Sequence, residues 1–187
     1  EITMYEDDPM WVGYYQMLEG MYGKHPIRNR LAGTAETVAE ITEETLQRAY
    51  ACYYTTDEMV LICAGDIPLG EVRRIAERVA RRETAARVYF PTEDAEIAEK
   101  YRACEMRLSV PQFQIGCKLP PLPKQDWLKK RMAAGFCMEL LAGESSVFFQ
   151  KAYEWDWLDE ALGSAFFCGE GYAFAAFSGS GKPSFSI

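Results

Sequence analysis

The stretch that decides the fold is Glu1-Ile2-Thr3-Met4-Tyr5-Glu6-Asp7-Asp8-Pro9, at the start of this 187-residue chain. Within it, Asp8-Pro9 predicts that one helix ends and another begins, because Asp is a favoured N-cap and Pro is favoured at the first helical position. Tyr22-Gly23-Lys24-His25-Pro26 then predicts the end of the second helix and a loop. Leu31-Ala32-Gly33-Thr34 opens a turn or short helix that we expect to run through residue 41.

The following residues predict a helix, a strand and another helix. Thr42 is a favoured N-cap. The buried face of its helix is expected to carry Leu46, Ala49, Tyr50 and Tyr53. Residues 59–64 are a short apolar run, typical of a buried strand. The helix after Pro68 is expected to turn Val72, Ile75, Ala76 and Val79 inward. Its basic run is expected to be a solvated face rather than a binding patch: Arg73, Arg74, Arg78, Arg81 and Arg82.

Residues 83–100 break these patterns, and we expect a surface connector there. Alternating apolar and polar side chains then predict a strand over residues 104–110 and, after Pro111, a second strand carrying Phe113, Ile115 and Cys117. Residues 127–142 predict a long helix, and Ser145 is expected to cap the next one. Two strands follow, near residues 164–168 and 172–178, and residues 178–183 predict flexibility, with 181–187 as a tail.

Strands and helices are segregated along the chain, which indicates an α+β fold rather than a βαβ repeat. Apolar residues make up 49% and charged residues 26%, a normal mixture for a soluble globular protein. The net charge of −8 argues against nucleic acid as a partner, because phosphates select basic faces. An anionic membrane surface is disfavoured for the same reason. We also see no continuous apolar run of about 18 residues, so no membrane span is expected.

The six cysteines show neither a Cys-x-x-Cys pair nor zinc-finger spacing. Most have apolar neighbours, so we expect buried structural thiols. Six unpatterned thiols favour a reducing compartment, and hence the cytoplasm. The first residues are acidic and carry neither an initiator Met nor a signal-peptide pattern. We therefore expect a trimmed segment of a longer polypeptide.

The opening residues resemble the insulinase/pitrilysin family of zinc metallopeptidases, entered partway along. In that family an inverted His-x-x-Glu-His helix supplies two zinc ligands and a general base. A glutamate on a later helix, in a Glu-Ile-x-Met-Tyr context, supplies the third ligand, and Glu1 matches it. The His-x-x-Glu-His motif is missing from this sequence. The resemblance therefore implies Zn in the full-length parent and none in this chain, with Glu1 as a metal ligand only beside ligands that this chain lacks.

Later stretches extend the resemblance. Gly116-Cys117-Lys118-Leu119-Pro120 is similar to the strand that opens the second domain of these peptidases, and residues 140–149 to their leucine-rich helix and Ser-Ser stretch. Residues 153–159 resemble a Tyr-Glu-x-Gly-Leu-x-Asp pattern, with Asp156 where Gly is usual. The resemblance implies that residues 1–82 are the C-terminal half of a first peptidase-type domain, 83–100 a linker, and 101–180 the N-terminal half of a second.

The implied fold is a metallohydrolase-like peptidase domain: a two-layer structure in which helices pack on one face of an antiparallel sheet. An isolated half-sheet leaves backbone groups unpaired. We therefore hypothesise that the two halves pack together as a permuted domain, or exchange across a dimer.

Other candidate sites are weaker. His25 is the only histidine, and a lone imidazole is more typical of a structural residue than of a ligand. Glu6-Asp7-Asp8 is better explained as helix-start charge than as a cation site. The arginine that holds the substrate carbonyl in active family members corresponds here to Tyr153. Pro183 after Gly181-Lys182 excludes a phosphate-binding P-loop. We therefore predict no catalytic residue in this chain.

The resulting hypothesis is a non-catalytic fragment of an insulinase-type metalloendopeptidase, which forms part of the wall of a chamber for peptide substrates. Its expected partners are a second copy or another peptidase half. The alternative is a stand-alone binding or scaffolding module with the same fold. A third hypothesis, an enzyme that uses another site, would require peptide hydrolysis by the pure chain without zinc.

Overall fold

The computed structural model describes residues 1–79, 89–155 and 162–181. The chain forms two compact units, one of Glu1–Thr34 with Phe90–Ile187 and one of Ala35–Tyr89. These units are defined by which residues of this chain pack together. The division into peptidase-domain halves, residues 1–82 and 101–180, is a statement about the family and stays a prediction. Residues 83–88 of the predicted connector lie outside the described residues.

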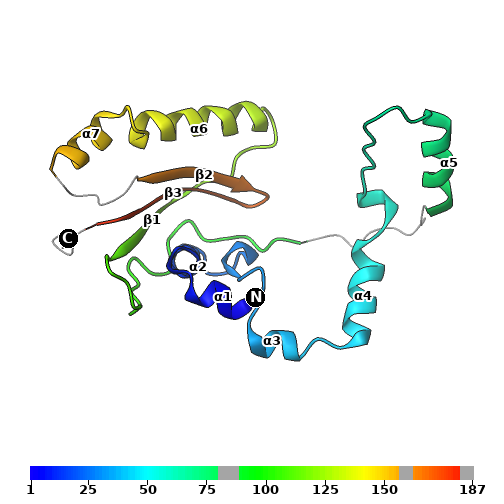
Figure 1. Cartoon of the computed structure of the whole chain (residues 1–187), viewed down its shortest axis with the longest axis horizontal. Helices are drawn as coiled ribbons and strands as arrows, with labels where there is room; N and C mark the ends of the chain where they lie inside the picture. The colour runs from blue at the N-terminus through cyan, green and yellow to red at the C-terminus, as the bar shows by residue number, and fades with distance from the viewer. Residues whose placement is uncertain (80–88, 156–161, 182–187) are drawn as a thin grey trace. The chain divides into compact units, whose positions relative to one another are not determined.

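An antiparallel three-stranded sheet forms the centre of the first unit (Figure 1). Its strands are β1 (Gln112–Leu119), β2 (Gly163–Gly169) and β3 (Tyr172–Ser180), in the order β1-β3-β2. The predicted strands of the β2–β3 hairpin are confirmed, and Gly171 takes the left-handed turn position with φ +80°. β3 extends to Ser180, where flexibility was predicted, because residues 178–180 pair with residues 112–114 of β1. Residues 182–187 of the predicted tail are not described.

The first unit also carries α1 (Ile2–Asp7), α2 (Pro9–Met21), the short η1 (Pro26–Arg28), α6 (Trp127–Ala142) and α7 (Val147–Glu154). The predicted break at Asp8-Pro9 is confirmed: the Asp8 carboxylate accepts the Met10 N–H at 2.8 Å and the Trp11 N–H at 3.3 Å. α6 has the predicted bounds. α7 is capped one residue later than predicted, because Ser146 accepts the Phe149 N–H at 3.0 Å.

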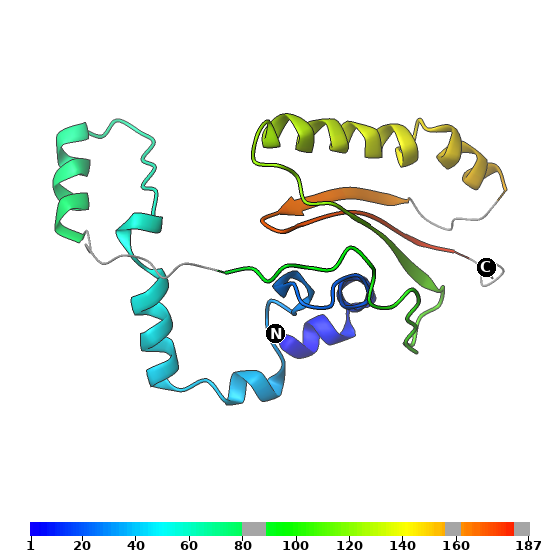
Figure 2. The ribbon, with the colours of Figure 1, turned by 180° about the vertical axis from the view of Figure 1, so that it is seen from behind.

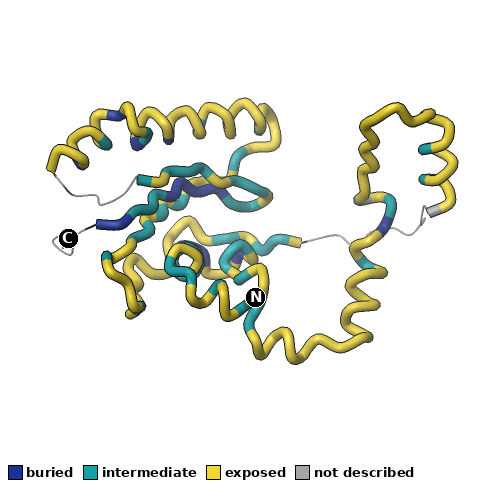
Figure 3. The backbone as a smooth tube through the Cα atoms, viewed as in Figure 1, coloured by how far each residue is buried: buried dark blue, intermediate teal, exposed yellow. Residues whose placement is uncertain are grey.

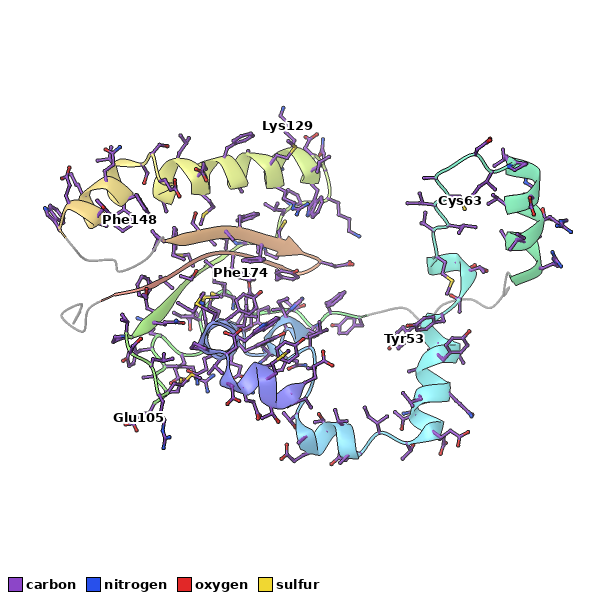
Figure 4. The ribbon with its side chains drawn as sticks, viewed as in Figure 1. Tyr53, Cys63, Glu105, Lys129, Phe148 and Phe174 are labelled. Atoms are coloured by element: carbon purple, nitrogen blue, oxygen red, sulfur yellow. The ribbon has the colours of Figure 1, made fainter. Side chains whose placement is uncertain are left out.

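Helices cover both faces of the sheet, as Figure 1 and the view from behind in Figure 2 show. Phe174 and Ala176 of β3 pack with Leu18 and Met21 of α2, and Phe174 lies between the sheet and that helix (Figure 4). Ala173 and Ala175 alternate to the other face, the side on which α6 contacts β2. The α+β class is confirmed, but helices flank the sheet on two sides instead of the predicted one. The central strand β3 is accordingly buried in a continuous run, residues 173–176.

The second unit contains α3 (Ala35–Ala39), α4 (Glu43–Tyr53), the short η2 (Thr56–Glu58) and α5 (Leu69–Val79). The predicted cap is confirmed, since Thr42 Oγ1 accepts the Thr45 N–H at 3.2 Å. The predicted buried face of α4 is wrong for this chain, because Leu46, Tyr50 and Tyr53 are exposed. Figure 3 shows α4 as exposed along nearly all of its length. Within the second unit the Tyr54 ring stacks on Tyr50, and the side chains of this face nevertheless stay exposed.

Two predicted strands are not formed. Residues 59–64 have no regular structure, and Val60 and Ile62 are 86% and 84% exposed. Residues 101–108 are likewise irregular, and β1 begins only after Pro111. Both sequences have the apolar content of strands, but a strand needs a neighbour to accept and donate its backbone hydrogen bonds. The described part of the chain supplies such a neighbour to neither segment.

The stretch Trp127–Glu154 has 28 residues and is, by length and composition alone, long and apolar enough to cross a membrane. The sequence had predicted no membrane span. The stretch consists of α6 and α7, separated by residues 143–146. α6 alone has 16 residues, fewer than the roughly 20 that cross a bilayer as a continuous helix. A single stretch of this kind is weak evidence, because core helices of other proteins pass the same test.

Candidate functional site

Glu1, the predicted metal ligand, precedes α1 and is exposed. Its carboxylate makes no capping bond to the helix backbone. Instead, the Tyr5 hydroxyl donates to Glu1 Oε1 at 3.2 Å, one turn along the helix. This hydrogen bond, together with the nearby negative charge, raises the pKa of Tyr5. The role of Glu1 as a ligand in a longer protein stays a prediction.

The residues that the structure describes do not by themselves fit a zinc ion. A catalytic zinc is held by three protein ligands and leaves one position open. Among the residues that the structure describes, no three His, Cys, Asp or Glu side chains lie close enough together to hold a metal. Glu1 contributes one carboxylate, and the Asp8 carboxylate at the other end of α1 is already engaged as the N-cap of α2.

The cysteines differ from their predicted burial. Cys63, Cys104, Cys117 and Cys137 are exposed in this chain, while Cys52 and Cys168 are half-buried, and all six are free thiols. Cys63, for example, lies on the irregular segment between η2 and α5 (Figure 4). The apolar neighbours that suggested burial are themselves exposed there, so sequence context alone misplaced these side chains.

A buried polar cluster that the sequence analysis missed lies where α2 ends. Three consecutive backbone N–H groups donate to the Glu93 carboxylate: Gly23 to Oε1 at 2.8 Å, and Lys24 and His25 to Oε2 at 2.9 and 2.7 Å. Burial acts to raise the pKa of Glu93. These three donors and the Lys118 ammonium outweigh it and lower that pKa to about 2. The carboxylate is therefore ionised at neutral pH.

Lys118 of β1 completes this cluster. Its Nζ donates to Glu93 Oε1 at 3.2 Å and to the carbonyl oxygens of Met21 and Glu96 at 2.9 Å each. The same Nζ lies 4.8 Å from the ring centroid of Tyr22. The side chains of Lys118 and Glu93 are 8% and 6% exposed. A buried ammonium with three acceptors is fully satisfied, because lysine has three donors.

His25 is also buried, and both ring nitrogens have backbone partners. Nδ1 accepts the Ile27 N–H at 3.1 Å, so Nε2 carries the proton and donates to the Glu170 carbonyl at 2.9 Å. The Phe90 ring stacks on the imidazole with centroids 5.3 Å apart. These contacts agree with the predicted structural role of His25.

A buried acid, a lysine and a histidine in one place could indicate a catalytic site. Here the partners are already supplied within the chain, so the arrangement ties three parts of the first unit together: the end of α2, the segment after Phe90, and β1. No local motif could have revealed it, because Glu93 lies 68 residues from His25 and 25 from Lys118.

Comparison with known proteins supports the family resemblance. The family model described as the peptidase M16 inactive domain matches residues 40–186. An uncharacterized zinc protease of Bacillus subtilis, YmfH, is 28% identical over 186 residues, which cover 96% of this chain and 44% of that protein. A second Bacillus protein described in the same words, YmxG, is 36% identical over 67 residues, or 36% of this chain and 16% of that protein.

Solved structures share the fold. An M16-like peptidase from Alicyclobacillus acidocaldarius aligns with 97% of this chain and 44% of its own, with a TM-score of 0.82 and 23% identity. A peptidase M16 inactive domain from Pseudomonas fluorescens covers the same shares with a TM-score of 0.77 and 16% identity. The chain thus spans less than half the length of each of these proteins. Since the family model covers most of the sequence and the fold agrees, this chain belongs to the peptidase M16 inactive-domain family.

Proposed function

We propose that this chain is a non-catalytic part of a zinc-dependent metalloendopeptidase of the insulinase family. The observation that carries the proposal is the match to the M16 inactive domain in a sequence with no His-x-x-Glu-His motif. The relative that matches along nearly the whole chain is named a zinc protease and is more than twice as long. In this setting the histidine ligands and the general base come from other polypeptide.

The proposed contribution of this chain is twofold. It forms part of the wall of the chamber that receives peptide substrates, and it supplies Glu1 as the third zinc ligand. The exposed position of Glu1 supports the second part, since the hydrogen bond that the described residues give its carboxylate is a local one from Tyr5. Zinc binds tightly only where its set of protein ligands is complete, so Glu1 would act as a ligand only beside the missing histidines.

Reconstitution tests this function. The chain is mixed with a polypeptide that carries the inverted His-x-x-Glu-His helix of an M16 peptidase, and cleavage of a fluorogenic peptide is followed with zinc present. We expect activity only in the mixture, and a loss of at least about 100-fold for Glu1→Gln, because the zinc then loses one of its three protein ligands and even outer-shell changes cost up to that much. Glu6→Gln, on the same exposed helix, is the matched control and retains activity.

The alternative, a binding or scaffolding module, predicts a different outcome of the same experiment. In that case the two polypeptides form a complex without hydrolysis, and Glu1→Gln changes nothing. Pairing with another peptidase half is thus part of both proposals. For the compartment we propose the cytoplasm, supported by six free thiols of which four are exposed.

A further inference from the structure

The backbone at the end of α2 forms a ready-made receptor for a carboxylate. Three successive N–H groups, those of Gly23, Lys24 and His25, converge on one anion. Successive amides that point into one concavity bind anions, usually phosphate or carboxylate groups of a ligand. Lys118 adds a buried positive charge on the Oε1 side. In this chain the anion is supplied by Glu93.

We propose that residues 23–25 and Lys118 form a carboxylate-binding site whose ligand is the chain's own Glu93, and that this internal ligand is the latch that holds residues 90–102 on α2 and β1. We call residues 90–102 the strap. The recognition is specific for a planar group with two oxygens. One oxygen is bound by the Gly23 N–H and the Lys118 ammonium, the other by the Lys24 and His25 N–H groups.

Besides the Glu93 latch, the Phe90 ring stacks on His25, and Lys118 donates to the Glu96 carbonyl. The other contacts of the strap to α2 and its following loop are weaker. The Lys24–Asp94 ion pair is largely exposed, and the Arg102–Glu19 pair is partly exposed. Exposed ion pairs contribute little, because water screens them. The Glu99 N–H donates to the Gly20 carbonyl at 2.8 Å, a single backbone bond. Removing the Glu93 carboxylate instead leaves three amide donors and a buried ammonium without their anion, which is strongly unfavourable.

The size of the vacated space identifies the ligand that can replace the latch. Glu93→Ala removes one methylene and the carboxylate, which together have the size of acetate. Acetate presents the same two oxygens to the same donors, whereas chloride is a single sphere and cannot bridge both sides. We therefore expect the Glu93→Ala variant to bind acetate. The wild-type protein should not bind acetate there, because the Glu93 carboxylate already occupies the site.

The test uses the 187-residue chain at pH 7 and measures hydrogen exchange of the Glu99 N–H, which donates to the Gly20 carbonyl and so reports whether the strap is attached to α2. We call this rate strap exchange. Glu93→Ala is expected to accelerate strap exchange about 100-fold in sodium chloride, as the loss of one partner of a buried pair implies. Replacing the chloride by sodium acetate at equal ionic strength is expected to restore slow exchange. The matched control is Glu96→Ala, because Glu96 contacts Lys118 through its backbone carbonyl and not its carboxylate.

Several results would overturn the proposal. Strap exchange in Glu93→Ala at the wild-type rate would show that Glu93 is no latch. Equal behaviour in acetate and chloride would show that the site does not select carboxylates. If Glu93→Ala fails to fold in chloride, its refolding yield is measured in acetate, where recovery supports the proposal and no recovery contradicts it. Glu93→Gln, which fills the space with an amide, should accelerate exchange without acetate rescue, and a wild-type rate would again exclude the latch.

Discussion

Gly116 decides how closely α2 approaches the sheet. A Cβ at this position would lie 2.5 Å from Met21 Sδ and 2.8 Å from Met17 Cγ, well inside contact distance. Gly116 shares its face of β1 with Lys118, so the same close approach also brings the ammonium to the end of α2. One missing methyl group therefore positions both the apolar contact and the buried ion pair.

Substituting Gly116→Ala should destabilise the chain by about 1–3 kcal/mol, because overpacking forces two methionines out of place. Gly135→Ala is the matched control on α6, where an added Cβ meets nothing within 4 Å. It should stabilise by about 0.5–1 kcal/mol through helix propensity. Urea unfolding followed by circular dichroism measures both, and equal effects would contradict the packing argument.

Asp8 ends one helix and begins the next, and its side chain is bonded to two backbone N–H groups of α2. Asp8→Ala should cost about 1 kcal/mol of stability, the usual value of a lost N-cap. Asp7→Ala serves as control because Asp7 is exposed at the end of α1, and a change within about 0.5 kcal/mol is expected. Thermal unfolding measures the loss of stability in both variants. An equal loss in Asp7→Ala would show that the loss in Asp8→Ala does not come from the missing N-cap.

Glu93 should make the stability of the first unit depend on acid pH. Its pKa falls from the ordinary 4.5 to about 2 on folding, so the folded state favours the ionised form. This contribution is fully present above about pH 5 and is lost as pH falls toward 2. The charged groups facing Glu93 are Lys118 and, nearby, the Lys24–Asp94 pair.

Urea midpoints at pH 6 and pH 3 measure this dependence. Glu93→Gln should lower stability at pH 6 by about 3 kcal/mol, as expected for a broken buried pair, and by clearly less at pH 3. Glu96→Gln is the control, because it removes a carboxylate that is not part of the buried pair and so reports the effect of low pH on stability in general. An unchanged pH dependence in Glu93→Gln would contradict the assignment.

At the scale of elements, several helices and segments expose apolar side chains that their sequences predict to be buried. α6 packs one side on the sheet through Met138 and Ala142. Its other side exposes a stripe with four-residue spacing: Leu128, Met132, Phe136 and Leu140. A helix that is apolar all round is typical of a buried one. The described residues of this chain do not bury that side of α6, and they do not bury residues 59–64 either.

Ile62→Ser should therefore change the stability of this chain by less than about 0.5 kcal/mol, despite replacing a large apolar side chain, because Ile62 is exposed. Phe174→Ala, which empties a fully buried position, should cost about 3–5 kcal/mol. Chemical denaturation of both variants checks the contrast. A large loss in Ile62→Ser would show that this segment is packed in the isolated chain.

Local signals predicted the elements that local chemistry specifies. Thr42 and Asp8-Pro9 mark helix starts by capping, and the strands predicted near residues 164–168 and 172–178 are confirmed as β2 and β3. The strands expected at residues 59–64 and 104–110 could not be judged locally, because a strand requires a partner. The Glu93–Lys118 pair was equally inaccessible, since it joins residues that only the tertiary fold brings together.

At the scale of the whole molecule, the chain matches a family fold along most of its length, and its sequence lacks the His-x-x-Glu-His motif. It matches the M16 inactive domain over residues 40–186 and aligns with solved relatives along 97% of its length. Its single histidine has both ring nitrogens engaged by backbone groups. Its buried acid and lysine neutralise each other. We therefore expect the catalytic groups of the proposed peptidase to come from other polypeptide.

The most direct measurement is a zinc-dependent peptidase assay of the purified 187-residue chain alone, with a fluorogenic peptide and a chelator-treated sample in parallel. We expect the same rate of peptide cleavage in the presence of zinc, in the presence of chelator and in buffer alone. Hydrolysis that requires zinc, is abolished by the chelator and copurifies with this chain would contradict it.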